Sequence, residues 1–92
     1  MDPNLHQQQG INHLRRVLGY APFVAEAGPG GAAGRAVVHL TPEDWHVVAD
    51  TLFTLGTPRE MLPEEIQGFD LANENATIRL HTDALVIDVE RM

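Results

Sequence analysis

The residues best suited to acid–base chemistry lie together on one predicted helix. His46 and Asp50 follow Glu43 by three and seven positions, so the three side chains fall on the polar side of a helix over residues 42–55. A carboxylate on each side of an imidazole favours its charged form, which can donate a proton or respond to pH. We expect an ordinary solvated helix face or, as the alternative, a small acid–base or metal-assisted enzyme that uses His46 with Glu43 and Asp50.

The other histidines are weaker starting points for a metal site. His6 and His13 are seven positions apart, which is roughly 10 Å along a helix, so they cannot chelate one ion by themselves. His39 and His81 lie near the ends of predicted strands and can meet only if those strands are neighbours. Two imidazoles would still lack the third protein ligand that a catalytic zinc site normally has. We therefore expect no metal ion and no cofactor.

A cluster of carboxylates is the most distinctive surface feature that the sequence predicts. It falls between the second helix and the last pair of strands, where Pro58, Pro63 and Gly68 interrupt regular structure. Its members are Glu60, Glu64, Glu65, Asp70 and Glu74. Exposed acidic loops can meet an arginine-rich surface, and aromatic residues such as Phe69 and Phe23 can anchor such contacts. The five carboxylates and Phe69 are the predicted partner-binding residues.

Composition excludes several classes of chemistry. The 92 residues contain no Cys, Ser or Lys, which excludes disulfides, thiolate nucleophiles, Ser–His–Asp triads, Walker-type phosphate loops and Schiff-base lysines. The formal net charge is −7, and residues 42–92 hold eleven of the thirteen carboxylates, against three arginines. Such a charge repels nucleic acid and attracts basic partners. Because no apolar run could span a bilayer and no secretory signal is recognisable, we expect a cytoplasmic protein that binds neither nucleic acid nor membranes.

The first half of the chain predicts one helix and one pair of strands. The spacing of apolar residues predicts a helix over 3–18, which Gly19 ends. Residues 20–27 then predict a first strand, and residues 35–40 predict its partner. The glycine-rich segment 28–34 between them is expected to be a flexible loop.

The second half predicts a helix and a hairpin. The helix covers residues 42–55, with Thr41 as its N-cap and Gly56 just beyond its end. Two strands are predicted over 77–81 and 84–90, joined by a short turn.

Alternation along the last strand predicts one buried face and one face in water. We place Leu85, Ile87 and Val89 on the buried face and Asp88 on the solvated face. A domain with so few aromatic residues needs most of them inside. The predicted aromatic core consists of Tyr20, Trp45 and Phe53.

These elements predict an α+β fold within a single domain that spans residues 1–92. Two helices pack on a small antiparallel sheet of about four strands, in the order helix-hairpin-helix-hairpin. A chain of this length can bury enough surface for one core.

The charge and the missing nucleophiles favour a small, acidic, noncatalytic protein-binding module whose partner presents a basic surface. A more specific version is an inhibitor that blocks a nucleic-acid-binding surface by presenting carboxylates where phosphates would lie, as small phage counter-defence proteins can. The remaining alternative is an oligomerising structural subunit that uses the strand from Leu85 to Val89, or the first helix, as its interface.

Overall fold

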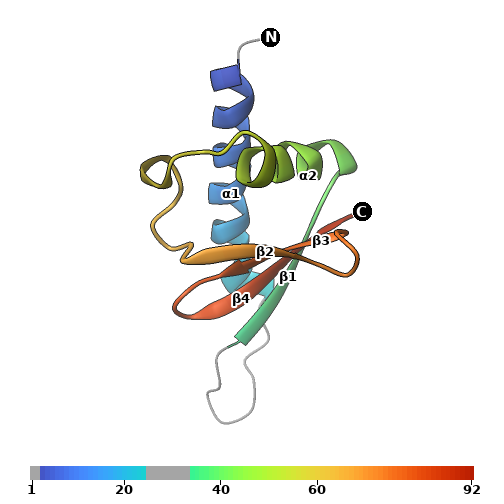
Figure 1. Ribbon diagram of the computed structural model, residues 1–92. Helices are drawn as coiled ribbons and strands as arrows, with labels where there is room; N and C mark the ends of the chain where they lie inside the picture. Colours follow the sequence, from blue (N-terminus) through green and yellow to red (C-terminus); the bar gives the residue numbers. More distant parts are fainter. Residues whose placement is uncertain (1–2, 25–33) are drawn as a thin grey trace.

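The computed structural model describes residues 3–24 and 34–92 (Figure 1). In chain order its elements are helix α1 (Pro3–Val24), strand β1 (Gly34–Leu40), helix α2 (Pro42–Ala49), π-helix η2 (Asp50–Thr54), 3-10 helix η3 (Arg59–Met61), and strands β2 (Gly68–Ala72), β3 (Thr77–His81) and β4 (Leu85–Arg91). The fold class is α+β with two main helices and a four-stranded sheet, as the sequence predicts.

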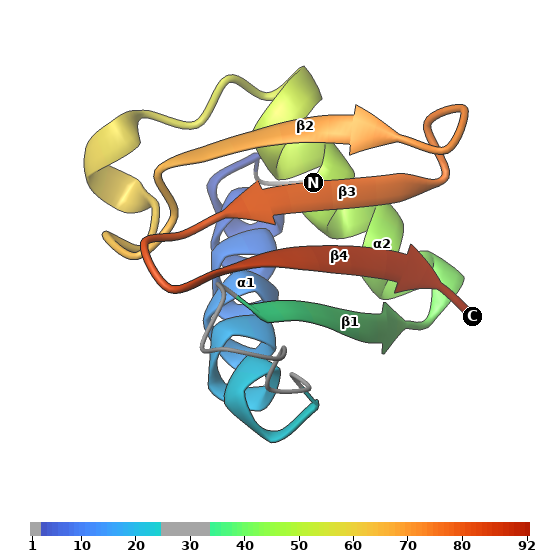
Figure 2. The same cartoon turned by 90° about the horizontal axis from the view of Figure 1, so that it is seen from below.

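The sheet is mixed, and this corrects the predicted antiparallel arrangement. Its strand order is β1-β4-β3-β2, in which β2 with β3 and β3 with β4 are antiparallel, but β1 with β4 is parallel (Figure 2). The first predicted hairpin is wrong because residues 20–24 belong to α1. Without a local partner, β1 pairs with the last strand of the chain.

The second predicted hairpin is confirmed. Strands predicted over 77–81 and 84–90 appear as the antiparallel pair β3 and β4. Thr82 closes the turn between them, because its hydroxyl donates to the carbonyl of Leu85 at 2.7 Å and accepts the N–H of Leu85 at 3.0 Å. Local turn chemistry therefore positions this end of the sheet.

Helix α1 continues past Gly19, where the sequence predicts its end. Leu14, Val17 and Ala21 are all buried and are spaced three and four positions apart, so the buried stripe extends beyond the glycine to the last turn, which ends at Val24. A glycine inside a helix costs about 1 kcal/mol, which is less than the gain from burying one aliphatic side chain. Tertiary packing therefore overrides the local stop signal.

The predicted first strand over 20–27 is wrong as far as Val24, where the chain is helical. Residues 25–33, which include nearly all of the loop predicted over 28–34, lie outside the described residues. Gly34, the last residue of that predicted loop, is the first residue of β1.

Helices α1 and η2 approach each other closely at Gly10. A Cβ atom at this position would lie 1.9 Å from Oγ1 of Thr51, which is fully buried and donates a hydrogen bond to the carbonyl of Val47 at 2.9 Å. Only glycine fits this contact without a shift of the backbone. The residue that weakens α1 locally is therefore required by its packing.

The helix predicted over 42–55 is confirmed by the continuous pair α2 and η2. The N–H of Asp44 donates to Oγ1 of Thr41 at 3.2 Å, which is the predicted N-cap. Gly56, just after the helix, has φ of +67°, a conformation that favours glycine. The last five helical residues are wound as a π-helix, which the sequence does not predict.

Both long helices cover one face of the sheet, and the apolar core lies between the two layers (Figures 1 and 2). Trp45 is buried there as predicted, and its Nε1 donates to the carbonyl of Val89 at 2.9 Å, while the guanidinium of Arg91 lies 4.7 Å from its ring centroid. The core placement of the other two aromatics is wrong, since Tyr20 is 53% exposed and Phe53 is 40% exposed.

Candidate functional site

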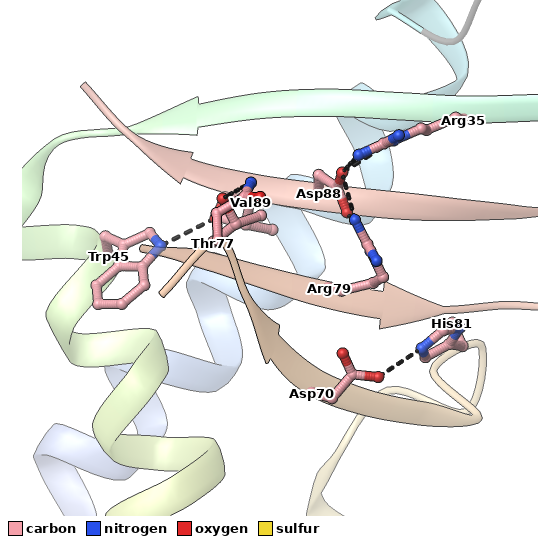
Figure 3. Close-up of polar contacts among 9 residues, drawn as sticks. Arg35, Trp45, Asp70, Thr77, Arg79, His81, Asp88 and Val89 are labelled. Atoms are coloured by element: carbon pink, nitrogen blue, oxygen red, sulfur yellow. Dashed lines mark hydrogen bonds and ion pairs between the residues drawn. The ribbon is translucent and has the colours of Figure 1, made fainter. Parts of the chain in front are cut away.

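The face of the sheet that the helices leave open carries a layer of charged side chains (Figure 3). Successive residues of a strand point to opposite faces, so the residues that alternate with the core share this open face. Its titratable members are Arg35, His39, Asp70, Arg79, His81, Asp88 and Glu90. We call this set the sheet-face cluster.

Asp88 is the centre of the sheet-face cluster. Its side chain is 0% exposed, and its two oxygens accept hydrogen bonds from Nε of Arg79 and Nε of Arg35, both at 2.9 Å. Burial alone would raise the pKa of Asp88, but the hydrogen bonds from Arg79 and Arg35 outweigh burial, so the pKa lies below the usual value of an aspartate. The predicted solvated position of Asp88 is wrong, because two arginines from the neighbouring strands enclose its carboxylate.

The two histidines of the sheet-face cluster do not meet. β4 separates the strand of His39 from the strand of His81, so the condition for a shared ion is not fulfilled. Each imidazole has its own carboxylate, with Nε2 of His39 3.1 Å from Glu90 and Nε2 of His81 2.9 Å from Asp70. Across residues 3–24 and 34–92, no group of three or more histidine and carboxylate side chains could hold a metal ion.

The predicted acid–base group on α2 is not assembled either. Asp50 lies 3.2 Å from Nε2 of His6 on α1, and this contact links the two helices. Glu43 and His46 are exposed. Within the part of the chain that the structure describes, His46 makes no side-chain hydrogen bond or ion pair with Glu43 or Asp50. The helix face therefore supplies interhelical pairing without a shared catalytic centre.

A groove of about 850 Å³ opens between the C-terminal half of α1, the segment 60–65 and the turn that precedes β4. Its apolar lining consists of Leu18, Ala21, Met61, Leu62, Leu85 and Ile87. Its acidic lining consists of Glu60, Glu64, Glu65 and Asp83, all of which are exposed. We call this hollow the acidic groove.

Among the described residues, the carboxylates of the acidic groove have no counter-ion. The ion pairs there involve the sheet-face cluster and the contacts of α1 with α2 and η2, and none of them includes an acidic groove residue. Arg15 is the one cation that lines the groove as described, and it too is exposed and forms no ion pair. The negative charge of the groove is therefore not neutralised from within the described structure.

Arg59 fixes the segment that carries Glu64 and Glu65 through hydrogen bonds to its backbone. Its guanidinium donates to the carbonyls of Pro63 at 3.2 Å, Glu64 at 3.4 Å and Ile66 at 2.5 Å. Because these bonds end on carbonyl oxygens, the arginine fixes the loop without occupying its carboxylates. The cation nearest in sequence to Glu60, Glu64 and Glu65 thus positions their segment and leaves their charge free.

The structure divides the predicted carboxylate cluster into three places. Glu60, Glu64 and Glu65 come together on the acidic groove. Asp70 belongs to the sheet-face cluster, where it contacts His81. Glu74 lies in the turn between β2 and β3, at the end of the sheet away from the groove (Figure 2).

Phe69 is half-buried, so its predicted role as an exposed aromatic anchor has no support in its placement. Its ring packs edge-to-face on Phe53 with centroids 5.3 Å apart, and it also touches the core. The side chain of Phe23 lies outside the described part of the structure.

Sequence reasoning missed Asp83 and the α1 residues of the groove, chiefly Arg15 and Leu18. These residues reach the groove only because α1, the segment 60–65 and the last turn meet in space. The one available signal was the placement of Asp83 in a predicted turn next to the final strand.

Three comparisons with known proteins find no significant match: no family model, no curated protein and no solved structure resembles the chain. Among the helices that the structure describes, none has the length and apolar character that crossing a membrane requires.

Proposed function

We propose that the protein is a noncatalytic binding module that holds a basic, partly apolar segment of a partner protein in the acidic groove. The observation that carries this proposal is the combination of an apolar lining with four carboxylates that have no counter-ion in the part of the chain that the structure describes. Most of the other carboxylates in the described ranges already face an arginine or a histidine.

The sizes of the electrostatic and apolar contributions to binding indicate what kind of partner fits the groove. An exposed ion pair contributes only about 0.2–1 kcal/mol, and salt screens it, so the carboxylates alone would give weak binding. Burial of one aliphatic side chain adds about 1.5–3 kcal/mol. The apolar lining therefore implies a partner segment in which arginines or lysines flank an apolar side chain, with the charges setting orientation and association rate.

The groove does not support the enzyme alternative. Its lining, among the described residues, contains no histidine, and the predicted group of Glu43, His46 and Asp50 lies elsewhere, on α2 and η2. Its concave shape also favours a partner segment that enters it, whereas a nucleic-acid mimic would itself occupy a nucleic-acid-binding groove of its partner.

Charge reversal with a matched control tests the proposal. The double variant Glu64→Arg/Glu65→Arg changes two unpaired groove carboxylates, while Glu43→Arg/Glu74→Arg makes the same change in net charge at two unpaired, exposed positions outside the groove. The probe is a short labelled peptide in which arginines flank a leucine, and binding is followed by fluorescence anisotropy at about 0.05 M and about 0.5 M salt.

We expect the groove variant to bind the probe about tenfold more weakly at low salt, and the control variant to stay within about twofold of the parent. A peptide with glycine in place of leucine should bind the parent more weakly at both salt concentrations, because it lacks the apolar contact. Equal losses in the two variants, or no binding by the parent protein, would contradict the proposal.

A further inference from the structure

Strand β1 forms one edge of the sheet, and its hydrogen-bonding pattern shows which backbone groups face outward. The N–H of Met92, one residue after β4, donates to the carbonyl of Leu40 at 2.8 Å, and Leu40 is in register with Arg91. In a parallel ladder this geometry means that Leu40, Val38 and Ala36 direct their N–H and C=O groups toward β4. The alternate residues of β1 must then direct theirs away from the sheet.

The outward-facing residues are Arg35, Val37 and His39. No backbone hydrogen bond from the described residues reaches them from outside the β1–β4 pair. Val37 is 38% exposed, and the side chain of Arg35 is 61% exposed, so this edge is open among the residues that the structure describes. Such an edge is a template for a further strand.

The two edges of the sheet differ in how they resist pairing. β2 at the other edge has only five residues, carries Asp70 at its centre and runs into a turn in which Asn73, Glu74 and Asn75 have positive φ. β1 has seven residues in unbroken register and contains no proline, lysine or carboxylate, and its one arginine, Arg35, donates to Asp88 within the sheet. An edge with few such protections is a template for pairing with another chain.

We propose that β1 pairs antiparallel with β1 of a second copy of this chain, about a two-fold axis at Val37. The edge is self-complementary in this register: Val37 meets Val37 of the second copy, and Arg35 meets His39. All three are outward-facing residues, so each pairing is of the hydrogen-bonded type and the three together form about six N–H···O bonds. The two sheets then join into one continuous sheet.

The charges of the residues that would lie opposite each other in the two copies are compatible with self-pairing. His39 lies beside Glu90, with Nε2 and Oε1 3.1 Å apart. Arg35 of one copy would therefore lie opposite a histidine of the other copy that itself contacts a carboxylate. The same two-fold pairing at the β2 edge would bring Asp70 close to Asp70 of the second copy. Repulsion between these like charges disfavours that pairing.

The helix layer offers a second argument for β1. Figure 2 shows the C-terminal end of α1 continuing past the β1 edge, on the face that the helices cover. In the last two turns of α1, Tyr20 is largely exposed and Leu18 is half-buried. A strand added at β1 would have α1 beneath it, as β1 itself does.

Sedimentation of the full chain from about 10 µM to about 1 mM tests the proposal, with Val37→Pro and Val37→Thr as a matched pair. The N–H of Val37 faces outward, so proline removes bonds only to the second copy, while threonine keeps the N–H and the branched shape. We expect a monomer–dimer equilibrium for the parent and for Val37→Thr, and a monomer at all concentrations for a folded Val37→Pro.

Amide hydrogen exchange on the parent protein keeps the test independent of whether the proline variant folds. The amides of Arg35, Val37 and His39 should exchange at least about tenfold more slowly at the highest concentration than at the lowest, while those of Val38 and Leu40 stay protected throughout. A strict monomer over the whole range would overturn the proposal. A dimer in which Val37 exchanges fast at every concentration would also overturn it, because the copies would then meet elsewhere.

Discussion

The sheet-face cluster and the acidic groove both contain carboxylates, but among the described residues only those of the sheet-face cluster have arginine or histidine partners. On the sheet face, Asp70, Asp88 and Glu90 each contact an arginine or a histidine of a neighbouring strand. In the groove, none of the four carboxylates has such a partner among the described residues, although Arg59 is close in sequence to three of them. The difference separates charge used to hold the fold from charge left for another molecule.

The two arginine arrangements show how the difference arises. Arg79 donates to the carboxylate of Asp88, and this hydrogen bond raises the pKa of the arginine. Arg59 donates to backbone carbonyls, so it organises a loop and neutralises no side chain. Net charge alone would not distinguish these two uses of arginine.

The largest effect should come from removing one carboxylate from each region. Asp88→Ala should lower the free energy of unfolding by about 2–3 kcal/mol, because it removes charge-assisted hydrogen bonds and leaves Arg35 and Arg79 facing each other. Asp83→Ala should change it by less than about 0.5 kcal/mol, since Asp83 is exposed, has no ion pair in the described structure and loses only a surface hydrogen bond from Gln67. Urea denaturation measures both, and equal losses would remove the distinction between the regions.

The pH dependence of stability sharpens the same comparison. The pKa of Asp88 is lower in the folded state than in an unfolded chain, so its stabilising contribution is fully present above the unfolded pKa and is lost as pH falls through the folded pKa. The stability difference between the parent and Asp88→Asn should be constant from about pH 7 to about pH 5 and shrink below about pH 4. Other carboxylates are common to both proteins and largely cancel. A difference that grows as the pH falls would contradict the assigned direction of the pKa shift.

A smaller effect is expected at Arg59. Arg59→Ala should cost about 1 kcal/mol and weaken binding of the basic peptide about three- to fivefold, because the segment that carries Glu64 and Glu65 loses its backbone contacts. The variant Arg59→Lys keeps the charge but lacks the planar group that reaches several carbonyls, so it should behave like the alanine variant. Amide exchange of residues 63–66 should accelerate in both variants. Restoration of binding by lysine would show that charge, and not positioning, is the contribution of Arg59.

Sequence reasoning succeeded where local signals decide structure. The helix over 42–55 follows from the N-cap at Thr41 and the stop at Gly56, and the final hairpin follows from alternation on either side of a short turn. These elements supply most of the scaffold. They also place Glu60, Glu64 and Glu65 in an irregular segment between the helix and the hairpin, as predicted.

Sequence reasoning failed where distant segments decide structure. Packing of α1 overrides the helix stop signal at Gly19. The parallel pairing of β1 with β4 joins the first strand of the sheet in the sequence to the last one. Burial of Asp88 needs Arg35 and Arg79 on the strands to either side, which only the strand order reveals. The groove likewise depends on a meeting of three separate segments.

Mapping amide chemical shifts during titration with the arginine- and leucine-containing peptide tests most directly whether the groove is the binding site. The largest changes should occur at residues 15–19, 60–65 and 82–85, with little change at Arg79 and His81 on the open face. Changes centred on the sheet-face cluster, or spread evenly over all exposed carboxylates, would contradict the assignment of binding to the acidic groove.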